Sequence, residues 1–335
     1  MSRFVKTFAK SKGMTLLIVT IIIFVFFTVM NPAYVSWNNL RSIMYSISLT
    51  GTITCGMACL MMSGAIDLAS GAEGMMGGII IAYLLGTGMP WPIALIIALL
   101  CGCCFGLINA FFANGLGFMP FIATIAFSSV LQGSAAAITR NQEIIIDNKS
   151  FWELGSINIW IFPLPFVIMA VLLIVYGIMV SSTKFGRQML LCGGNRAAAR
   201  LAGLNFKKIT TIMYINNGAI AVLGGSILAA RMHRGSSQAV VGAEMTGMTA
   251  AIIGGVSFLG GGSSGMISLF LGILMLNCFK NGLLAVALDP YWQTVSNGGL
   301  LILALIVDYV REKRKLRIIN LAAIANKNSI LSKIK

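Results

Sequence analysis

The chain has 335 residues, of which 58% are apolar and only 10% are charged, and its mean hydropathy is +0.90. A soluble domain usually carries about 25% charged residues to keep its surface wet, so this composition excludes a soluble enzyme, a coiled coil and a disordered chain. The net charge of +15 does not indicate nucleic-acid binding, because the basic residues gather between and beyond long apolar runs. The sequence predicts an all-α polytopic membrane protein.

The apolar runs predict about ten transmembrane helices, since one span needs ~20 predominantly apolar residues. The first run is long for the apolar core of a signal peptide, and poor cleavage residues follow it, so we expect it to be retained as a span. The expected spans are 14–30, 41–62, 68–87, 91–113, 118–139, 163–181, 209–230, 244–258, 266–288 and 291–308.

The basic residues predict the orientation. Most of the 24 lysines and arginines lie in the arm 1–13, the segment 182–208 and the tail 309–335. Ten spans place these three segments on one side, and positive residues resist translocation, so that side is the cytoplasm. We expect a cytoplasmic arm at 1–13, a transmembrane domain at 14–308 and a cytoplasmic tail at 309–335 along the anionic inner leaflet.

The seven cysteines predict neither a disulfide framework nor a metal site. Six fall inside expected spans and none falls in an outside loop. The cluster at 101–104 has no histidine near it in the sequence, and small buried packing residues are the better interpretation. No metal ligands and no cofactor are expected.

Few ionisable residues approach membrane depth. Only Asp67, Glu73 and Glu244 do so among the acids, and no Arg or Lys falls at the centre of an expected span. Transporters coupled to protons or sodium usually place ionisable groups near the midplane. We therefore expect that any energy for transport comes from elsewhere.

Neutral polar side chains recur inside the spans. Asn and Gln both donate and accept hydrogen bonds, which suits a route for a polyhydroxylated neutral solute. The same side chains also hydrogen-bond neighbouring helices at about 1 kcal/mol or less each, and both interpretations stay open. The candidates for a substrate pathway are Asp67, Asn109, Gln132, Asn216, Asn217, Gln293 and Asn297.

Two glycine-rich stretches, 63–71 and 254–265, interrupt the apolar runs. Broken backbone at membrane depth is tolerated only where protein or a water-filled cavity satisfies it, and paired breaks point to a transport route. Flexible turns between spans are the alternative. The second stretch lacks the Gly-Lys-Ser/Thr of a phosphate-binding loop.

The polar segment 182–208 predicts a short cytoplasmic helix. Asn195 is a plausible N-cap, 196–201 is strong helix-forming sequence, and Gly203 supplies a stop at the C′ position. Two turns are marginally stable alone, so we expect this helix to dock against something; a plain connector is the alternative.

Taken in order, these motifs resemble the membrane permease subunit of ribose-type sugar ABC importers, over roughly residues 35–310. The stretch Ser-Gly-Ala-Ile-Asp-Leu at 63–68 is similar to the family's SGGIDLSVG block, with Ala65 in place of a glycine. Further matches lie at 106–109, 120–124, 186–187 with 193–205, 254–257, 260–261, 281–283 and 291–293.

The resemblance implies a bacterial inner-membrane subunit that pairs with a second permease subunit, two ABC ATPase subunits and an extracytoplasmic solute-binding protein. It implies that the helix within 193–205 is a coupling helix that enters a groove of the ATPase. The family's EAA-x-x-x-G loop has Ala197 here in place of its acid, which removes a salt bridge from that position. The implied ATPase-coupling residues are Gly193, Asn195, Ala198, Ala199, Arg200 and Gly203.

The resemblance also implies that the chain is no enzyme and has no catalytic residue, since its partners would hydrolyse ATP. The implied solute is a sugar or a sugar-like neutral molecule. A secondary transporter or facilitator that works without an ATPase is the alternative function.

Overall fold

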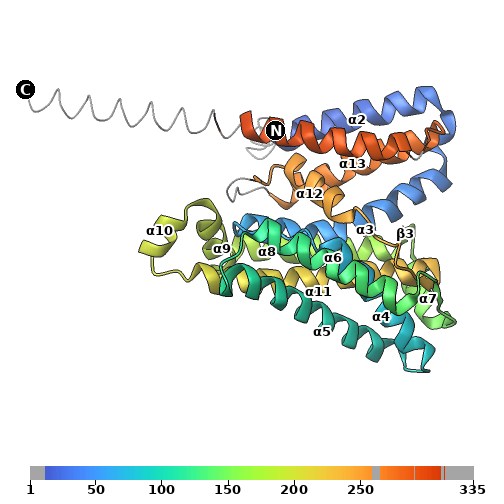
Figure 1. Cartoon of the computed structure of the whole chain (residues 1–335). Helices are drawn as coiled ribbons and strands as arrows, with labels where there is room; N and C mark the ends of the chain where they lie inside the picture. The colour runs from blue at the N-terminus through green and yellow to red at the C-terminus, as the bar shows by residue number, and fades with distance from the viewer. Residues whose placement is uncertain (1–11, 259–264, 290, 311–312, 314–335) are drawn as a thin grey trace, which may run out of the picture.

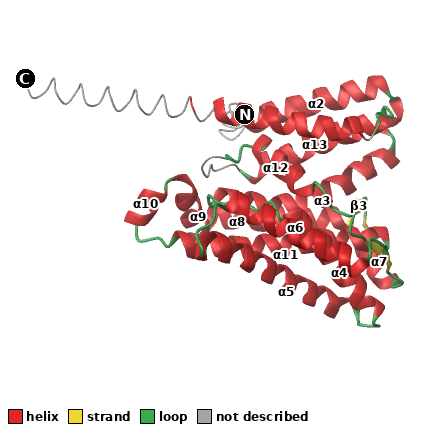
Figure 2. Cartoon of the chain, in the orientation of Figure 1, coloured by secondary structure: helices red, strands yellow, loops and turns green. Residues whose placement is uncertain are grey.

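The computed structural model describes residues 12–258, 265–289, 291–310 and 313. Nearly all of this part is helical, and the few strands lie together at one end of the molecule (Figure 2). The all-α class expected from the composition is therefore confirmed. The helices are α2 (Lys12–Met30), α3 (Trp37–Met62), α4 (Ser70–Gly86), α5 (Trp91–Ala110), α6 (Pro120–Thr139), α7 (Lys149–Ser156), α8 (Leu164–Ser182), α9 (Lys184–Gly194), α10 (Arg196–Leu201), α11 (Phe206–Met232), α12 (Ala243–Ile253), α13 (Met266–Ala285) and a last helix, Tyr291–Val310.

Shorter elements complete the described chain. A 3-10 turn (Pro32–Val35) follows α2, and a π-helical turn (Phe111–Gly115) extends α5. The strands are β1 (Ile144–Ile145), β2 (Asn158–Ile159), β3 (Phe162–Pro163) and β4 (Arg234–Gly235), which pair antiparallel as β1–β4 and β2–β3. The β1–β4 pair is joined by an ion pair in which Arg234 donates to Glu143 at 2.7 Å.

Eight of the described helices are long and apolar enough to cross a membrane, namely α2, α3, α5, α6, α8, α11, α13 and the last helix. The expected span at 68–87 corresponds to α4, whose 17 residues are near the lower limit for a span. The expected span at 244–258 is wrong as a continuous helix. There, α12 has only 11 residues and rises about 16 Å, roughly half of a hydrocarbon core of about 30 Å.

The first glycine-rich break is confirmed as irregular backbone. The chain leaves α3 at Met62 and does not become helical again until Ser70. In the second stretch, α12 ends at Ile253 and residues 254–258 form a turn and bend, while 259–264 lie outside the described residues. The arm 1–13 and the tail 309–335 also lie mostly outside them.

The helix α11 runs through the larger layer of the molecule, where it packs against α3, α4 and α5 (Figure 1). A second, smaller group contains α2 and α13 side by side, and the hydroxyl of Tyr34 donates to the carbonyl of Cys278 at 2.8 Å there. The helix α12 contacts both α3 and α13. The two groups are therefore joined through α3 and α12.

Close packing of α11 depends on glycine. A methyl group added at Gly218 of α11 would overlap the carbonyl oxygen of Gly102 on α5, and one added at Gly225 would overlap the carbonyl of Gly74 on α4. In a membrane, small residues let helix backbones approach where no hydrophobic effect drives helices together. The glycines thus determine how closely α4 and α5 lie against α11.

We expect Gly218→Ala to lower the thermal stability of the purified protein in detergent. The new methyl group meets backbone on α5, which cannot move aside, and overpacking of this kind costs about 1–3 kcal/mol. Gly133→Ala in α6 is the matched control, because an added methyl there lies in open space and alanine favours a helix by about 1 kcal/mol. Equal unfolding temperatures for the two variants would contradict this account of the packing.

Candidate functional site

The short helix α10 has the predicted ends. The side chain of Asn195 accepts a hydrogen bond from the backbone N–H of Ala198 at 2.9 Å, which caps the helix. After Leu201 the chain reaches Gly203, whose φ of 73° lies in the left-handed region that glycine tolerates. The backbone N–H of Gly203 donates to the carbonyl of Arg200 at 3.0 Å. Local sequence alone therefore determines where this helix begins and ends.

One face of α10 is buried and the other is free. Ala199 is buried, whereas Ala198 and Arg200 are exposed and Leu201 is 91% exposed. The helix lies at the end of the molecule, beyond the ends of the long helices (Figure 1). An apolar side chain of this size in water adds nothing to the stability of the isolated chain. The exposed face is thus available to another protein.

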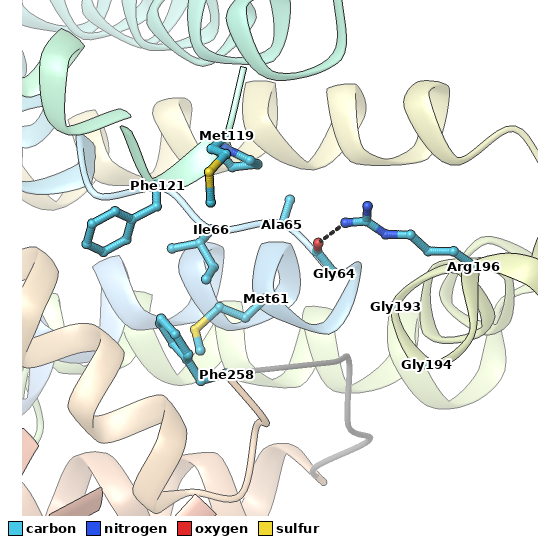
Figure 3. A pocket seen from close by; sticks show the side chains of 11 residues that line it. Met61, Gly64, Ala65, Ile66, Met119, Phe121, Gly193, Gly194, Arg196 and Phe258 are labelled. Atoms are coloured by element: carbon cyan, nitrogen blue, oxygen red, sulfur yellow. Dashed lines mark hydrogen bonds between the residues drawn. The ribbon is translucent and has the colours of Figure 1, made fainter. Parts of the chain in front are cut away.

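The end of α9 and the start of α10 contact the end of α3 and the broken segment 63–69. The guanidinium of Arg196 donates to the carbonyl of Gly64 at 3.0 Å (Figure 3). It also stacks over the ring of Phe206, with 4.2 Å to the ring centroid. At the end of α9, a methyl group added at Gly193 would overlap the carbonyl of Met62. The segment α9–α10 therefore lies directly on the point where α3 ends.

A cavity of about 760 Å³ lies beside this contact. Its wall combines the end of α3 and the broken segment with the start of α6 and with Phe258, and Arg196 lies at its edge (Figure 3). The side chains that face it are mostly apolar, including Met61, Ile66 and Phe121. The broken segment and the start of α6 therefore both contribute to the wall of this cavity.

A buried polar network holds the middle of the broken segment. The carboxylate of Asp67 accepts hydrogen bonds from the backbone N–H of Ala69 at 2.8 Å and from the side-chain amides of Asn109 at 3.2 Å and Asn217 at 3.0 Å. The same amide of Asn109 donates to Glu73 at 3.0 Å. All four of these side chains have an exposed fraction of 0%. The network therefore connects the broken segment to α4, α5 and α11 inside the protein.

The backbone of the segment is also bound from two further helices. The hydroxyl of Thr124 on α6 accepts from the N–H of Leu68 at 3.1 Å, and the hydroxyl of Tyr214 on α11 donates to the carbonyl of Ile66 at 3.0 Å. Polar backbone at membrane depth needs such partners, because hydrocarbon offers none. The partners of the segment come from positions between 42 and 150 residues away along the chain.

The other predicted pathway residues lie apart from this network. Asn216 accepts from the hydroxyl of Tyr176 at 2.7 Å, Gln132 is exposed on α6 and donates to Ser128, and Gln293 donates to the carbonyl of Leu288. Asn297 lines a second cavity, of about 420 Å³, between α12, α13 and the last helix. The structure thus brings together Asp67, Asn109 and Asn217, and separates the rest.

The sequence analysis did not predict the contacts that two charged residues make. Glu73 shares the amide of Asn109 with Asp67, and Lys280 lines the second cavity from α13, where it is only partly exposed. Lys280 lies 14 positions into the expected span 266–288. A lysine inside a transmembrane helix indicates a functional role, so the sequence did carry a signal for this residue. The contact of Glu73 had no such signal, because it depends on how α4 packs against α5.

A bundle of membrane-length helices, with a broken segment held inside it and a capped helix outside it, is the architecture of a multi-pass membrane protein. A family model described as the permease component of branched-chain amino acid transport systems matches residues 39–305. The chain belongs to this permease family, within its ribose-type sugar ABC group.

Three curated relatives illustrate the match. The chain is 31% identical to the L-arabinose transport system permease protein AraH of Escherichia coli, over 90% of this chain and 91% of that protein. It is 26% identical to the ribose import permease protein RbsC of Bacillus subtilis, over 86% and 89%. It is 28% identical to the xylose transport system permease protein XylH of Haemophilus influenzae, over 89% and 96%. No solved structure matches.

Proposed function

We propose that the chain is the membrane subunit of an ATP-driven importer for a sugar or sugar-like solute. It pairs with a second permease subunit, two ATPase subunits dock on its α10 helices, and an extracytoplasmic solute-binding protein delivers the solute. The single observation that carries the docking is the exposed apolar face of α10 with Leu201 on it. The names of the relatives, which are permeases for arabinose, ribose and xylose, support the solute class.

The contacts of the broken segment supply a route for coupling. A movement of α10 would be transmitted to Gly64 through the hydrogen bond from Arg196, and to Asp67 through the two intervening residues of the chain. From Asp67 the hydrogen bonds continue to Asn109 on α5 and Asn217 on α11. ATP-dependent closure of the ATPase pair would move this segment and the helices that hold it, and alternating access follows from that movement.

The orientation proposed for the chain places both termini in the cytoplasm of a bacterium, with α9 and α10 on the same side. The start of α2 and the end of the last helix point toward the end of the molecule where α9 and α10 lie (Figure 1). The clustering of basic residues in the same three segments supports this side as the inner one. The transmembrane permease domain then covers 14–308, between a basic arm and a basic tail.

The roles of the polar residues divide in this proposal. Asp67, Asn109 and Asn217 transmit movement, because they bind one another in the packed interior. Asn297 faces solute, because it lines a cavity. Gln132, Asn216 and Gln293 stay as pathway candidates, and Gly193, Asn195, Ala198, Ala199, Arg200 and Gly203 form the coupling region.

Reconstitution into liposomes tests the proposal. With its ATPase and its solute-binding protein present, we expect uptake of a labelled sugar or sugar-like solute that requires ATP inside the vesicle, where the ATPase subunits face. Without the ATPase we expect no accumulation against a gradient, because ATP hydrolysis supplies the energy in this proposal. Accumulation that follows an imposed proton gradient, in the absence of the ATPase, would instead identify a secondary transporter.

A further inference from the structure

We propose that the cavity of about 420 Å³ between α12, α13 and the last helix is a solute-binding site, and that Lys280 makes it select a hydroxyl-rich solute carrying a carboxylate. The inference rests on the proposed transport function and narrows its solute class from sugars to sugar acids. Nothing in the names of the relatives specifies an acidic solute.

The lining of the cavity suits a small polyhydroxylated molecule. Three hydroxyl groups, one amide and one ammonium face it beside several aliphatic side chains, and its volume lies within the range of small-ligand sites. The polar groups come from three separate helices, so a bound molecule would be contacted from several directions. They are Thr246, Thr249, Lys280, Thr294 and Asn297.

The cavity lies at membrane depth. Lys280 stands five residues before the end of α13, and Asn297 stands six residues after the start of the last helix. At 1.5 Å per residue, each lies roughly 8–9 Å inside the end of its helix. These helix ends lie at the opposite end of the molecule from α10 (Figure 1), so the cavity occupies the half from which an imported solute would enter.

Lys280 lacks an opposite charge. Its Nζ donates to the hydroxyl of Thr246 at 3.4 Å, and no carboxylate among the described residues lies within the 4.0 Å of an ion pair. Of the acids on neighbouring elements, Glu244 faces Gly71 on α4, and Asp289 accepts from the backbone N–H of Tyr291. The lysine therefore faces the cavity without a partner of opposite charge.

A partly buried, unpaired lysine in a membrane is costly, and such residues mark substrate routes. A neutral sugar would satisfy the ammonium with hydroxyl oxygens only. A carboxylate would also neutralise its charge, through hydrogen bonds about twice as strong as those between neutral groups. The cavity thus combines hydroxyl and amide groups for the ring of a sugar with a cation for an acid group.

Glucose and glucuronate form the matched pair of probes, because they differ only in the carboxylate at C6. We expect glucuronate to raise the unfolding temperature of the purified permease more than glucose does. Lys280→Met is expected to weaken glucuronate binding roughly ten- to one-hundredfold and to weaken glucose binding much less, because glucose offers the ammonium only neutral hydroxyl oxygens. Lys280→Arg should restore part of the preference, and Lys149→Met on the exposed face of α7 should behave like wild type.

Several outcomes would overturn the inference. One is equal stabilisation of wild type and Lys280→Met by glucuronate, and another is no stabilisation by glucuronate at all. A third is that anionic phospholipid, rather than glucuronate, stabilises wild type but not Lys280→Met, which would assign Lys280 to a lipid headgroup. ATP-driven uptake of neutral sugars without uptake of glucuronate would refute this inference alone, whereas absence of any ATP-driven uptake would refute the proposed function.

Discussion

Leu201→Asp is expected to abolish ATP-driven uptake while the permease stays folded. The side chain of Leu201 is 91% exposed, so its replacement should change the stability of the isolated chain by less than about 0.5 kcal/mol. In a complex the same side chain would be buried in a groove of the ATPase. A carboxylate placed there loses its water without gaining a partner, and a central contact of this kind is worth about 2 kcal/mol or more, which is roughly thirtyfold in affinity.

The measurement has two parts. Co-purification of the ATPase with tagged permease reports the docking, and uptake into vesicles that hold ATP reports the coupling. Leu201→Met is the conservative control and should retain both. Leu191→Asp on the neighbouring helix α9 is the positional control, since Leu191 is also exposed but lies outside α10. Full uptake by Leu201→Asp would remove α10 from the coupling interface.

Asp67→Leu is expected to prevent accumulation of folded protein. The substitution takes the acceptor away from the N–H of Ala69 and from the amides of Asn109 and Asn217, all within a site that water does not reach. Each buried group left unsatisfied costs about 1–3 kcal/mol. Three of them together approach the whole stability of a typical domain, which is about 5–15 kcal/mol.

Asp67→Asn separates this effect from the simple loss of a carboxylate. An asparagine keeps one oxygen that can accept from Ala69 or from one amide, so we expect a folded protein with a modestly lower unfolding temperature. The readouts are the yield of monodisperse protein in gel filtration and its thermal unfolding in detergent. If Asp67→Leu is as stable as wild type, the network does not hold the broken segment in place.

The transport rate of Asp67→Asn would distinguish a loss of coupling from a loss of ATPase docking. The variant changes the link between Gly64 and the helices α5 and α11 without touching the exposed face of α10. In the proposed route, it should bind the ATPase normally and still transport more slowly. Docking and coupling would then be lost separately, by Leu201→Asp and Asp67→Asn respectively.

The sequence by itself determined the features whose causes are local. The ends of α10 depend on Asn195 and Gly203, whose hydrogen bonds and backbone angles involve residues only a few positions away. Most of the membrane-length helices followed from the length and apolarity of their runs, because a bilayer requires both. The break at 63–69 followed from its small and polar residues. Each of these features depends on neighbours along the chain.

The tertiary structure alone decided the rest. The apolar run at 244–258 does not reveal that only 243–253 are helical, since apolarity does not distinguish a half-length helix from a full span. Asp67, Asn109 and Asn217 form one network because α5 and α11 pack closely through glycines. Lys280 becomes a candidate binding residue only because Thr246 and Asn297, on two other helices, line the same cavity. These contacts join residues far apart along the chain, and only the packing of helices brings them together.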